Sequence, residues 1–267
     1  MKEKKAAVLA VSFGTSYEDT RRKTLDVIEK EMQEAYPDWP LYRAWTSGMV
    51  RKKIKERDGI EIPGVGQALE MMKRDGISRI AVQPTHMMNG FEYWKLYGEI
   101  SDMREQFDRI SVGKPLLTDL TDCDQVLQEL VKEIPAAEDE ALVLMGHGSL
   151  HYANFVYAAL NYRLRELGYQ NVHIGTVEAW PSLESVSACV RAQNPKKVIL
   201  APFLIVAGDH ATNDLAGEEE DSWRSYFLAE GYQVECVLRG LGEYTGIRRI
   251  LLEHLREAVD ELNGEQK

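Results

Sequence analysis

Two histidines and a glutamate each follow a short apolar run, and each lies close to glycine. His147 lies in LMGHGS, Glu178 in GTVEAWP and His210 in VAGDHATND. Apolar runs of this length are typical of buried strands, and open α/β sheets bind ligands at the carboxyl ends of their strands. Two imidazoles at neighbouring strand ends could share one small target, either a metal ion or a ring that carries protons. Together with a carboxylate, they suit a borderline divalent metal in a site that keeps open positions.

Each of these three residues also has a structural interpretation. A single histidine at a strand end is usually structural, and His210 could simply begin a helix that Asp209 or Thr212 caps. Glu178 could interact with the dipole of a following helix. The glycines on both sides of His147 would let a ligand approach the backbone closely. The repeated arrangement therefore favours a functional interpretation.

Short apolar runs alternate with longer amphipathic stretches along the whole chain. The runs predict strands at 6–12, 41–46, 79–84, 109–112, 141–146, 171–177, 196–202 and 233–237. The stretches predict helices at 17–35, 48–57, 65–75, 92–106, 124–134, 151–166, 182–192, 222–230 and 244–262. Ser47 and either Thr15 or Ser16 are expected to cap the helices that follow them. Apolar strands that alternate with helices predict an α/β fold whose sheets are mostly parallel.

The two halves of the chain resemble each other. An apolar run that leads into Gly14 mirrors the run that leads into Gly148. In each half, a second apolar run ends in proline, and a glycine follows this proline at the same distance in both halves. When the two halves are aligned on these residues, Glu92 matches His210. An internal repeat of this kind predicts that each half is one structural unit of the same type.

We therefore expect two similar α/β lobes with parallel sheets that face each other across a cleft. The boundary is expected in the acidic stretch 135–139, which divides the chain into residues 1–136 and 137–267. The C-terminal lobe would carry both histidines and Glu178, and the N-terminal lobe would contribute Glu92.

The three motifs resemble those of the anaerobic sirohydrochlorin cobaltochelatases (CbiK type), which are class II chelatases. Segments 11–20, 44–59 and 86–93 are similar to the same family, and the similarity runs in order along nearly the whole chain. The resemblance implies the chelatase fold, which has two similar Rossmann-like lobes with parallel sheets and a cleft between them. It also implies an ATP-independent enzyme that inserts Co²⁺ into sirohydrochlorin, or precorrin-2, in anaerobic cobalamin biosynthesis.

The resemblance also implies roles for the individual residues. His147, Glu178 and His210 would hold the metal and act as catalytic residues, with one histidine doubling as base and Glu178 as third ligand or proton acceptor. Glu92 would bind the substrate or relay a proton. The side chains expected to line the floor beneath the ring are apolar: Phe13, Met87, Met88, Trp180, Phe203 and Leu204.

Composition excludes several other classes of protein. The net charge of −11 argues against nucleic acid as a partner. No apolar run approaches the ~18 residues of a membrane span. The three cysteines include no CxxC pair, which argues against a thiolate zinc site and for free thiols. The first apolar stretch is short and lacks a cleavage pattern, so we expect a buried strand there and a cytoplasmic protein.

Few further components are expected. Nucleotide-binding patterns are missing, so no cofactor beyond the substrate Co²⁺ is predicted. The expected partners are sirohydrochlorin and a divalent metal, and a homo-oligomer is compatible with these features.

Three alternatives stay open at this point. The same fold could insert iron or nickel into the same tetrapyrrole, because such sites accept several metals. The chain could be a carrier of tetrapyrrole or metal without turnover, although a carrier need not keep both a base and an open metal position. A periplasmic-type binding protein with two lobes is disfavoured by the missing signal peptide.

Overall fold

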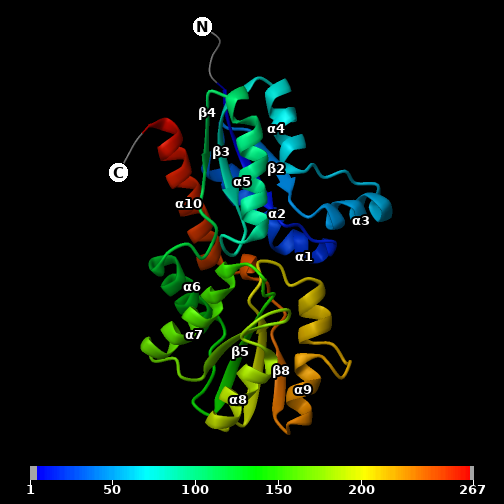
Figure 1. Cartoon of the computed structure of the whole chain (residues 1–267), viewed down its shortest axis with the longest axis vertical. Coiled ribbons are helices and arrows are strands. Elements are labelled where there is room, and N and C mark those ends of the chain that lie inside the picture. Colours follow the sequence, from blue (N-terminus) through cyan, green and yellow to red (C-terminus); the bar gives the residue numbers. More distant parts are fainter. Residues whose placement is uncertain (1–4, 265–267) are drawn as a thin grey trace. The chain divides into compact units, whose positions relative to one another are not determined.

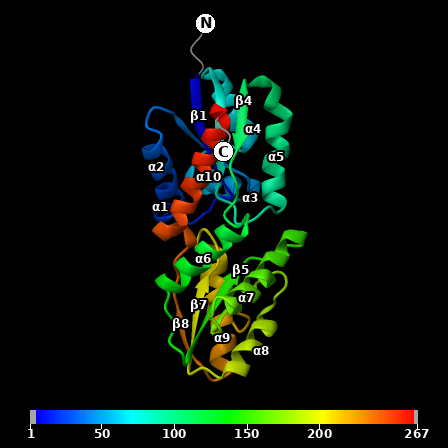
Figure 2. The same ribbon diagram turned by 90° about the vertical axis from the view of Figure 1, so that its left-hand side faces the viewer.

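The computed structural model describes residues 5–264 (Figure 1). Within this range the chain forms two compact units. The first runs up to Thr118 and resumes at Arg248, and the second extends from Asp119 to Ile247. Each unit is built around its own four-stranded parallel sheet, with helices on both faces (Figures 1 and 2). The predicted α/β class with parallel sheets is confirmed.

The first unit has the strand order β2-β1-β3-β4. Its strands are β1 (Lys5–Ser12), β2 (Leu41–Trp45), β3 (Ile77–Pro84) and β4 (Arg109–Val112). Its helices are α1 (Glu18–Lys23), α2 (Leu25–Ala35), α3 (Gly48–Asp58), α4 (Val65–Arg74), α5 (Phe91–Met103) and the later part of α10 (Thr245–Asn263), with a short 3-10 turn at Arg104–Gln106. Figure 2 shows α4 and α5 on one side of this sheet and α2 and α10 on the other. Apolar side chains such as Leu69, Val82 and Leu96 form the core under α4 and α5.

The second unit has the strand order β6-β5-β7-β8. Its strands are β5 (Glu140–Gly146), β6 (Val172–Thr176), β7 (Lys197–Pro202) and β8 (Gln233–Cys236). Its helices are α6 (Leu120–Glu133), α7 (Val156–Glu166), α8 (Leu183–Gln193) and α9 (Trp223–Ala229), with 3-10 turns at Tyr152–Phe155 and Leu241–Glu243 and a π-helical turn at Ala211–Leu215. Between residues 5 and 264, no helix combines the length and apolar character that crossing a membrane requires.

The two sheets have the same topology, which confirms the internal repeat. In each, the first and third strands of the unit lie side by side, and the second strand flanks the first. The chain therefore leaves the first and third strands in opposite directions, which opens a crevice at their carboxyl ends where ligands bind. In the second unit these strands are β5 and β7, and His147 and His210 follow them along the chain.

The units divide the chain differently from the boundary expected after residue 136. Helix α6 belongs to the second unit, where Arg163 on α7 donates to Asp124 on α6 at 2.7 and 2.6 Å. Most of α10 returns to the first unit, where Ser111 on β4 donates to Glu261 at 2.7 Å. An amphipathic helix must cover an apolar face, but its own sequence does not say which sheet provides that face.

The predicted helix 17–35 is interrupted. Thr24 leaves helical geometry, with φ −121° and ψ −83°, and its hydroxyl donates to a carbonyl four residues earlier. Neither Thr15 nor Ser16 is the N-cap, since α1 begins after Tyr17, whose N–H donates to the Thr15 hydroxyl at 3.2 Å. Ser47 does cap α3 as predicted, accepting from a backbone N–H at 3.3 Å.

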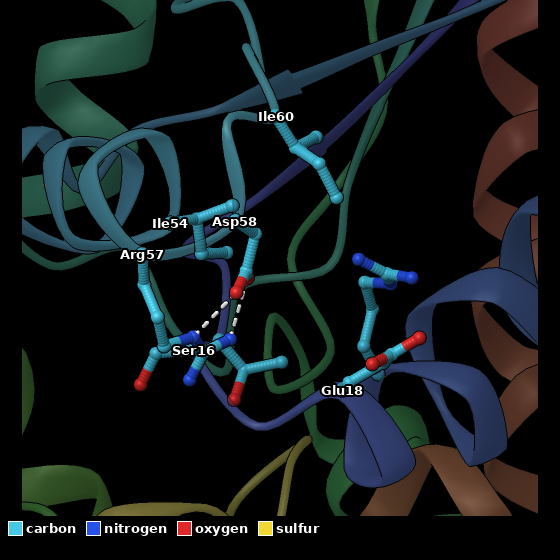
Figure 3. Close-up of a pocket in the computed structure, with 8 residues that line it drawn as sticks. Ser16, Glu18, Ile54, Arg57, Asp58 and Ile60 are labelled. Atoms are coloured by element: carbon cyan, nitrogen blue, oxygen red, sulfur yellow. Dashed lines mark hydrogen bonds and ion pairs between the residues drawn. The ribbon is translucent and has the colours of Figure 1, made fainter.

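A cavity of about 290 Å³ lies beside the turn that follows β1 (Figure 3). The two arginines that line it already have partners. Arg57 donates to both carboxylate oxygens of Asp58 at 2.7 and 2.6 Å, and Arg21 lies 3.2 Å from Asp26. A ligand would have to compete with these ion pairs, so the cavity is a weak candidate for a binding site.

Candidate metal centre

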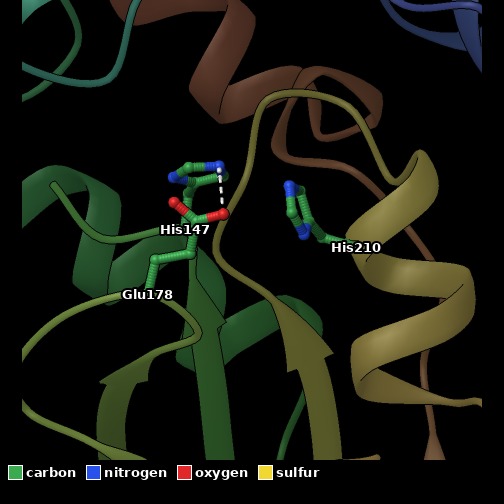
Figure 4. Close-up of side chains that lie close together, drawn as sticks. All are labelled: His147, Glu178 and His210. Carbon is green, nitrogen blue, oxygen red and sulfur yellow. Dashed lines mark ion pairs between the residues drawn. The ribbon is translucent and has the colours of Figure 1, made fainter.

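Three side chains meet at the carboxyl edge of the second sheet (Figure 4). His147 directly follows β5, Glu178 stands in the loop after β6, and His210 stands in the connection after β7. One ligand atom from each lies within 4.8 Å of the other two. Three residues spread over more than sixty positions of the sequence thus converge where a doubly wound sheet binds its ligand.

The ring of His147 has a defined tautomer. Its Nδ1 lies 2.8 Å from the carbonyl oxygen of Gly148. A carbonyl can only accept a hydrogen bond, so Nδ1 donates and the neutral ring keeps a lone pair on Nε2. That Nε2 lies 3.8 Å from Oε1 of Glu178. The turn itself needs glycine, because Gly148 has φ +89° and a Cβ there would lie 2.8 Å from the Cβ of Ala179.

The loops that carry His147 and Glu178 are tied together. The N–H of Glu178 donates to the carbonyl of His147 at 2.9 Å, just beyond the last paired residues of β5 and β6. Asn154 is buried and connects both loops. Its Nδ2 donates to the carbonyl of Trp180 at 2.6 Å, and its Oδ1 accepts from the N–H of Ser149 at 2.9 Å. A buried amide with both ends bonded holds the two loops in one arrangement.

His210 reaches the site from a longer connection. The N–H of Leu241 donates to the carbonyl of Leu204 at 2.8 Å, which holds that connection against the 3-10 turn that follows β8. The π-helical turn Ala211–Leu215 begins directly after His210. π-Helical turns are rare and are frequent at functional sites. Here the turn places Asp214 so that its Oδ2 lies 2.6 Å from Nδ1 of His210.

The centre is open to a substrate. The side chains of His147, Glu178 and His210 are 44%, 57% and 33% exposed. Ligand atoms around one tetrahedral ion at about 2.0–2.2 Å are roughly 3–3.5 Å apart. Here Nε2 of His147 and Oε1 of Glu178 are 3.8 Å apart, and the ligand atoms of all three residues lie within 4.8 Å of one another. Small side-chain movements would therefore bring all three onto one ion, while other coordination positions stay free.

The fourth predicted residue, Glu92, belongs to the first unit. It stands in the first turn of α5, where the helix dipole stabilises a carboxylate. Its Oε2 is buried and has no hydrogen-bond partner among residues 5–264. An acceptor left without a donor in this way is costly unless something else binds to it.

The prediction of an apolar ring floor is wrong for one of its members. Phe203 is fully buried and packs edge-on against Tyr157 with centroids 6.2 Å apart, so it offers no surface to a substrate. Phe13 and Trp180 are 48% and 52% exposed and stay available for such a role.

Asp214 and Asn154 were not predicted from the sequence. Asp214 stands four residues after His210, a spacing that brings side chains together on a helix. The sequence therefore did contain a signal for the contact between these two residues. Nothing in the sequence around Asn154 marks it.

The three cysteines are free and take no part in the centre. Burial raises the pKa of the Cys123 thiol to about 11 and also raises the pKa of Cys236. Thiols that stay protonated are poor metal ligands.

The model of one protein family, cobalt chelatase (CbiK), matches residues 6–260. The chain belongs to this family. Its similarity extends to curated cobalt chelatases. The sirohydrochlorin cobaltochelatase of Salmonella typhimurium is 38% identical over 257 residues, covering 96% of this chain and 97% of that protein. The sirohydrochlorin cobaltochelatase CbiKC of Nitratidesulfovibrio vulgaris is 34% identical, covering 97% of this chain and 92% of that protein.

Two solved structures share the fold of this chain. SirB from Bacillus subtilis with Fe³⁺ matches with a TM-score of 0.67 and 15% identity, covering 97% of this chain and 98% of that chain. A multi-domain protein from Deinococcus radiodurans with structural similarity to chelatases matches with a TM-score of 0.64 and 13% identity, covering 96% of this chain and 56% of that chain. At these identities the likeness shows the fold alone, and it confirms the expected chelatase-like fold.

Proposed function

We propose that the chain is a sirohydrochlorin cobaltochelatase that inserts Co²⁺ without ATP. The observation that carries the proposal is the group of His147, Glu178 and His210 at the carboxyl edge of a sheet. This group occurs in a chain of the cobalt chelatase family whose curated relatives are named for this reaction.

The proposed ligand set suits a metal that must be bound and then released. Nε2 of both imidazoles and one oxygen of Glu178 hold Co²⁺, which binds nitrogen and oxygen donors well. Three protein ligands leave coordination positions for the ring nitrogens. A thiolate-rich site would retain the metal more strongly, and the group contains no thiolate.

The protons are balanced by the same three groups. Insertion replaces two N–H protons of the ring with one Co²⁺, so two protons must leave for each ion. As the metal passes to the ring nitrogens, the imidazoles and Glu178 regain their lone pairs. Two of these groups then accept the protons and later pass them to water, and a positioned carboxylate or imidazole is an effective acceptor.

We assign Glu92 to the substrate. Its buried Oε2 lacks a donor among the described residues, and a pyrrole N–H or a protonated carboxyl of the ring would provide one.

The experiment that tests the function is anaerobic absorbance spectroscopy with catalytic amounts of protein and an excess of sirohydrochlorin and Co²⁺. The control is the double variant His147→Ala/His210→Ala. Multiple turnovers with the wild type alone support the proposal. A one-to-one spectral shift without turnover would indicate a carrier, and the absence of any shift would contradict tetrapyrrole binding.

The same assay tests the metal. Ni²⁺ and Fe²⁺ are supplied separately and then in competition with Co²⁺. We expect the protein to insert Co²⁺ and also to insert the other ions, because an open site of nitrogen and oxygen ligands discriminates weakly between divalent metals. Turnover with iron or nickel but not with cobalt would assign the chain to a different chelatase activity.

A further inference from the structure

The two histidines of the centre are held at Nδ1 by different kinds of acceptor. His147 donates to the backbone carbonyl of Gly148 at 2.8 Å. His210 donates to the side-chain carboxylate of Asp214 at 2.6 Å. The first contact is between adjacent residues of the backbone turn. The second depends on a side chain that can be replaced.

The π-helical turn keeps Asp214 in place. Ala211 and Leu215 are 1% and 0% exposed, and they anchor the turn in the core. The N–H of Gly217 donates to the carbonyl of Asn213 at 3.0 Å, and a Cβ on Gly217 would lie 2.3 Å from that oxygen. The backbone on both sides of Asp214 is therefore closely packed. Its carboxylate, with a side chain 40% exposed, stays at the edge of the centre.

We propose that Asp214 is the positioning residue of His210. This inference rests on the proposed metal site. An unrestrained neutral imidazole exchanges its hydrogen between Nδ1 and Nε2 and can rotate about its bond to Cβ. The carboxylate of Asp214 retains the hydrogen on Nδ1. Nε2 therefore keeps its lone pair and faces the metal.

Asp214 has a second effect through its charge. Glu178 and Asp214 together carry two negative charges, which match the two positive charges of Co²⁺ once the imidazoles are neutral. A carboxylate that accepts a hydrogen bond from a metal-binding histidine orients the ring and makes it a more basic metal ligand. The loss of such a carboxylate costs about 10–100-fold in metal affinity or activity.

Two variants separate orientation from charge. Asp214→Ala removes both the acceptor and the charge. Asp214→Asn removes the charge, but its Oδ1 can still accept from Nδ1–H. Glu220→Ala is the matched control, because it removes one exposed negative charge from the same region without a contact to His210.

The first measurement is NMR of the histidine side chains in metal-free protein, which reports the nitrogen that carries the hydrogen. We expect His210 to carry it on Nδ1 in the wild type, in Asp214→Asn and in Glu220→Ala. We expect a mixture of tautomers in Asp214→Ala. A wild-type His210 with the hydrogen on Nε2 would overturn the proposal without any variant, so the test does not depend on whether Asp214→Ala folds.

The second measurement is steady-state insertion with Co²⁺ varied. We expect the KM for Co²⁺ to rise about 10–100-fold in Asp214→Ala, with a smaller change in kcat, and to recover in part in Asp214→Asn. An unchanged KM in a folded Asp214→Ala overturns the proposal. If wild-type protein shows the expected tautomer but no insertion, the proposed function fails while the positioning of His210 by Asp214 stands.

Discussion

The imidazole rings of His147 and His210 meet edge to face, with centroids 4.6 Å apart and planes at 86°. His147 directly follows β5, and His210 stands in the connection that follows the neighbouring strand β7. Two rings at nearly a right angle can each direct a lone pair at one ion without their faces stacking. Each ring is also held at Nδ1, so both present Nε2.

Replacing either histidine by alanine should abolish metal insertion and leave the fold intact. Each ring is partly exposed, so little packing is lost. The loss of a direct ligand should cost more than the roughly 10–100-fold typical of an outer partner. Turnover by absorbance and unfolding by circular dichroism check both statements. His151→Asn is the control, since asparagine can replace the N-cap contact of His151 with the N–H of Ala153. Near-normal turnover in His147→Ala or His210→Ala contradicts the assignment.

Glu178→Gln should slow insertion more than it weakens binding of the ring. Glutamine has the same shape but carries no charge and accepts no proton. We expect kcat to fall by about 10²-fold or more, the usual contribution of a positioned acid or base. The dissociation constant for sirohydrochlorin, measured by absorbance without metal, should stay within about threefold. An unchanged kcat would remove Glu178 from the reaction.

Asn154→Ala should reduce both stability and activity. The substitution leaves the carbonyl of Trp180 and the N–H of Ser149 without their partner, which costs about 1–3 kcal/mol of unfolding free energy. Only the backbone hydrogen bond from Glu178 to His147 would then tie the two loops directly, and insertion should slow at temperatures where the protein is folded.

The matched control for that variant is Asn161→Ala. Asn161 also bridges backbone groups, with the N–H and the carbonyl of Ile174 at 2.8 and 2.6 Å, but it does so within the body of the second unit. It should lose comparable stability in urea denaturation and keep its kcat. Equal losses of kcat in both variants would mean that Asn154 acts through stability alone.

His86 should make the protein sensitive to acid. Burial lowers the pKa of His86 from 6.5 to about 4, while Thr46 lies within hydrogen-bond distance of its Nε2. Above pH 6.5 the ring is neutral in both states and contributes no pH dependence. Between pH 6.5 and 4 the unfolded chain takes up a proton that the native state excludes, which destabilises the fold by roughly 3 kcal/mol in total.

The measurement is urea denaturation of wild type and His86→Gln across this range. The difference in unfolding free energy between the two proteins should be constant above pH 6.5. It should shift against the wild type as the pH falls toward 4. A difference that does not change with pH would show that His86 titrates normally in the native state.

Glu92→Gln should weaken the use of sirohydrochlorin. If the buried Oε2 accepts from the substrate, loss of the charged acceptor costs about 1.5–3 kcal/mol, or roughly 10–100-fold in kcat/KM. The KM for Co²⁺ should change little, because Glu92 is not a member of the metal group. Glu105→Gln, an exposed position just beyond the same helix, is the control. An unchanged kcat/KM for sirohydrochlorin would exclude Glu92 as a substrate contact.

The secondary structure could be predicted closely because its signals are local. The apolar run 141–146 corresponds to β5 (Glu140–Gly146), and the amphipathic stretch 65–75 corresponds to α4 (Val65–Arg74). The interruption of the helix at Thr24 could not be predicted, because it depends on whether the threonine hydroxyl donates to a carbonyl of the preceding turn.

The sequence by itself determined the alternation of strands and helices, the repeat and the three residues proposed to bind the metal. Each of these features can be identified from short segments of the sequence. The three metal-binding candidates could be grouped because parallel strands end at a common edge of the sheet. Only the tertiary structure decided that α10 returns to the first unit, that Asn154 connects two loops and that the carboxylate of Asp214 lies 2.6 Å from Nδ1 of His210. The first two depend on which groups distant along the chain meet once the sheets are covered, and no local pattern encodes such a meeting. The third has a local spacing of four residues, but the contact depends on the π-helical turn that the chain forms there.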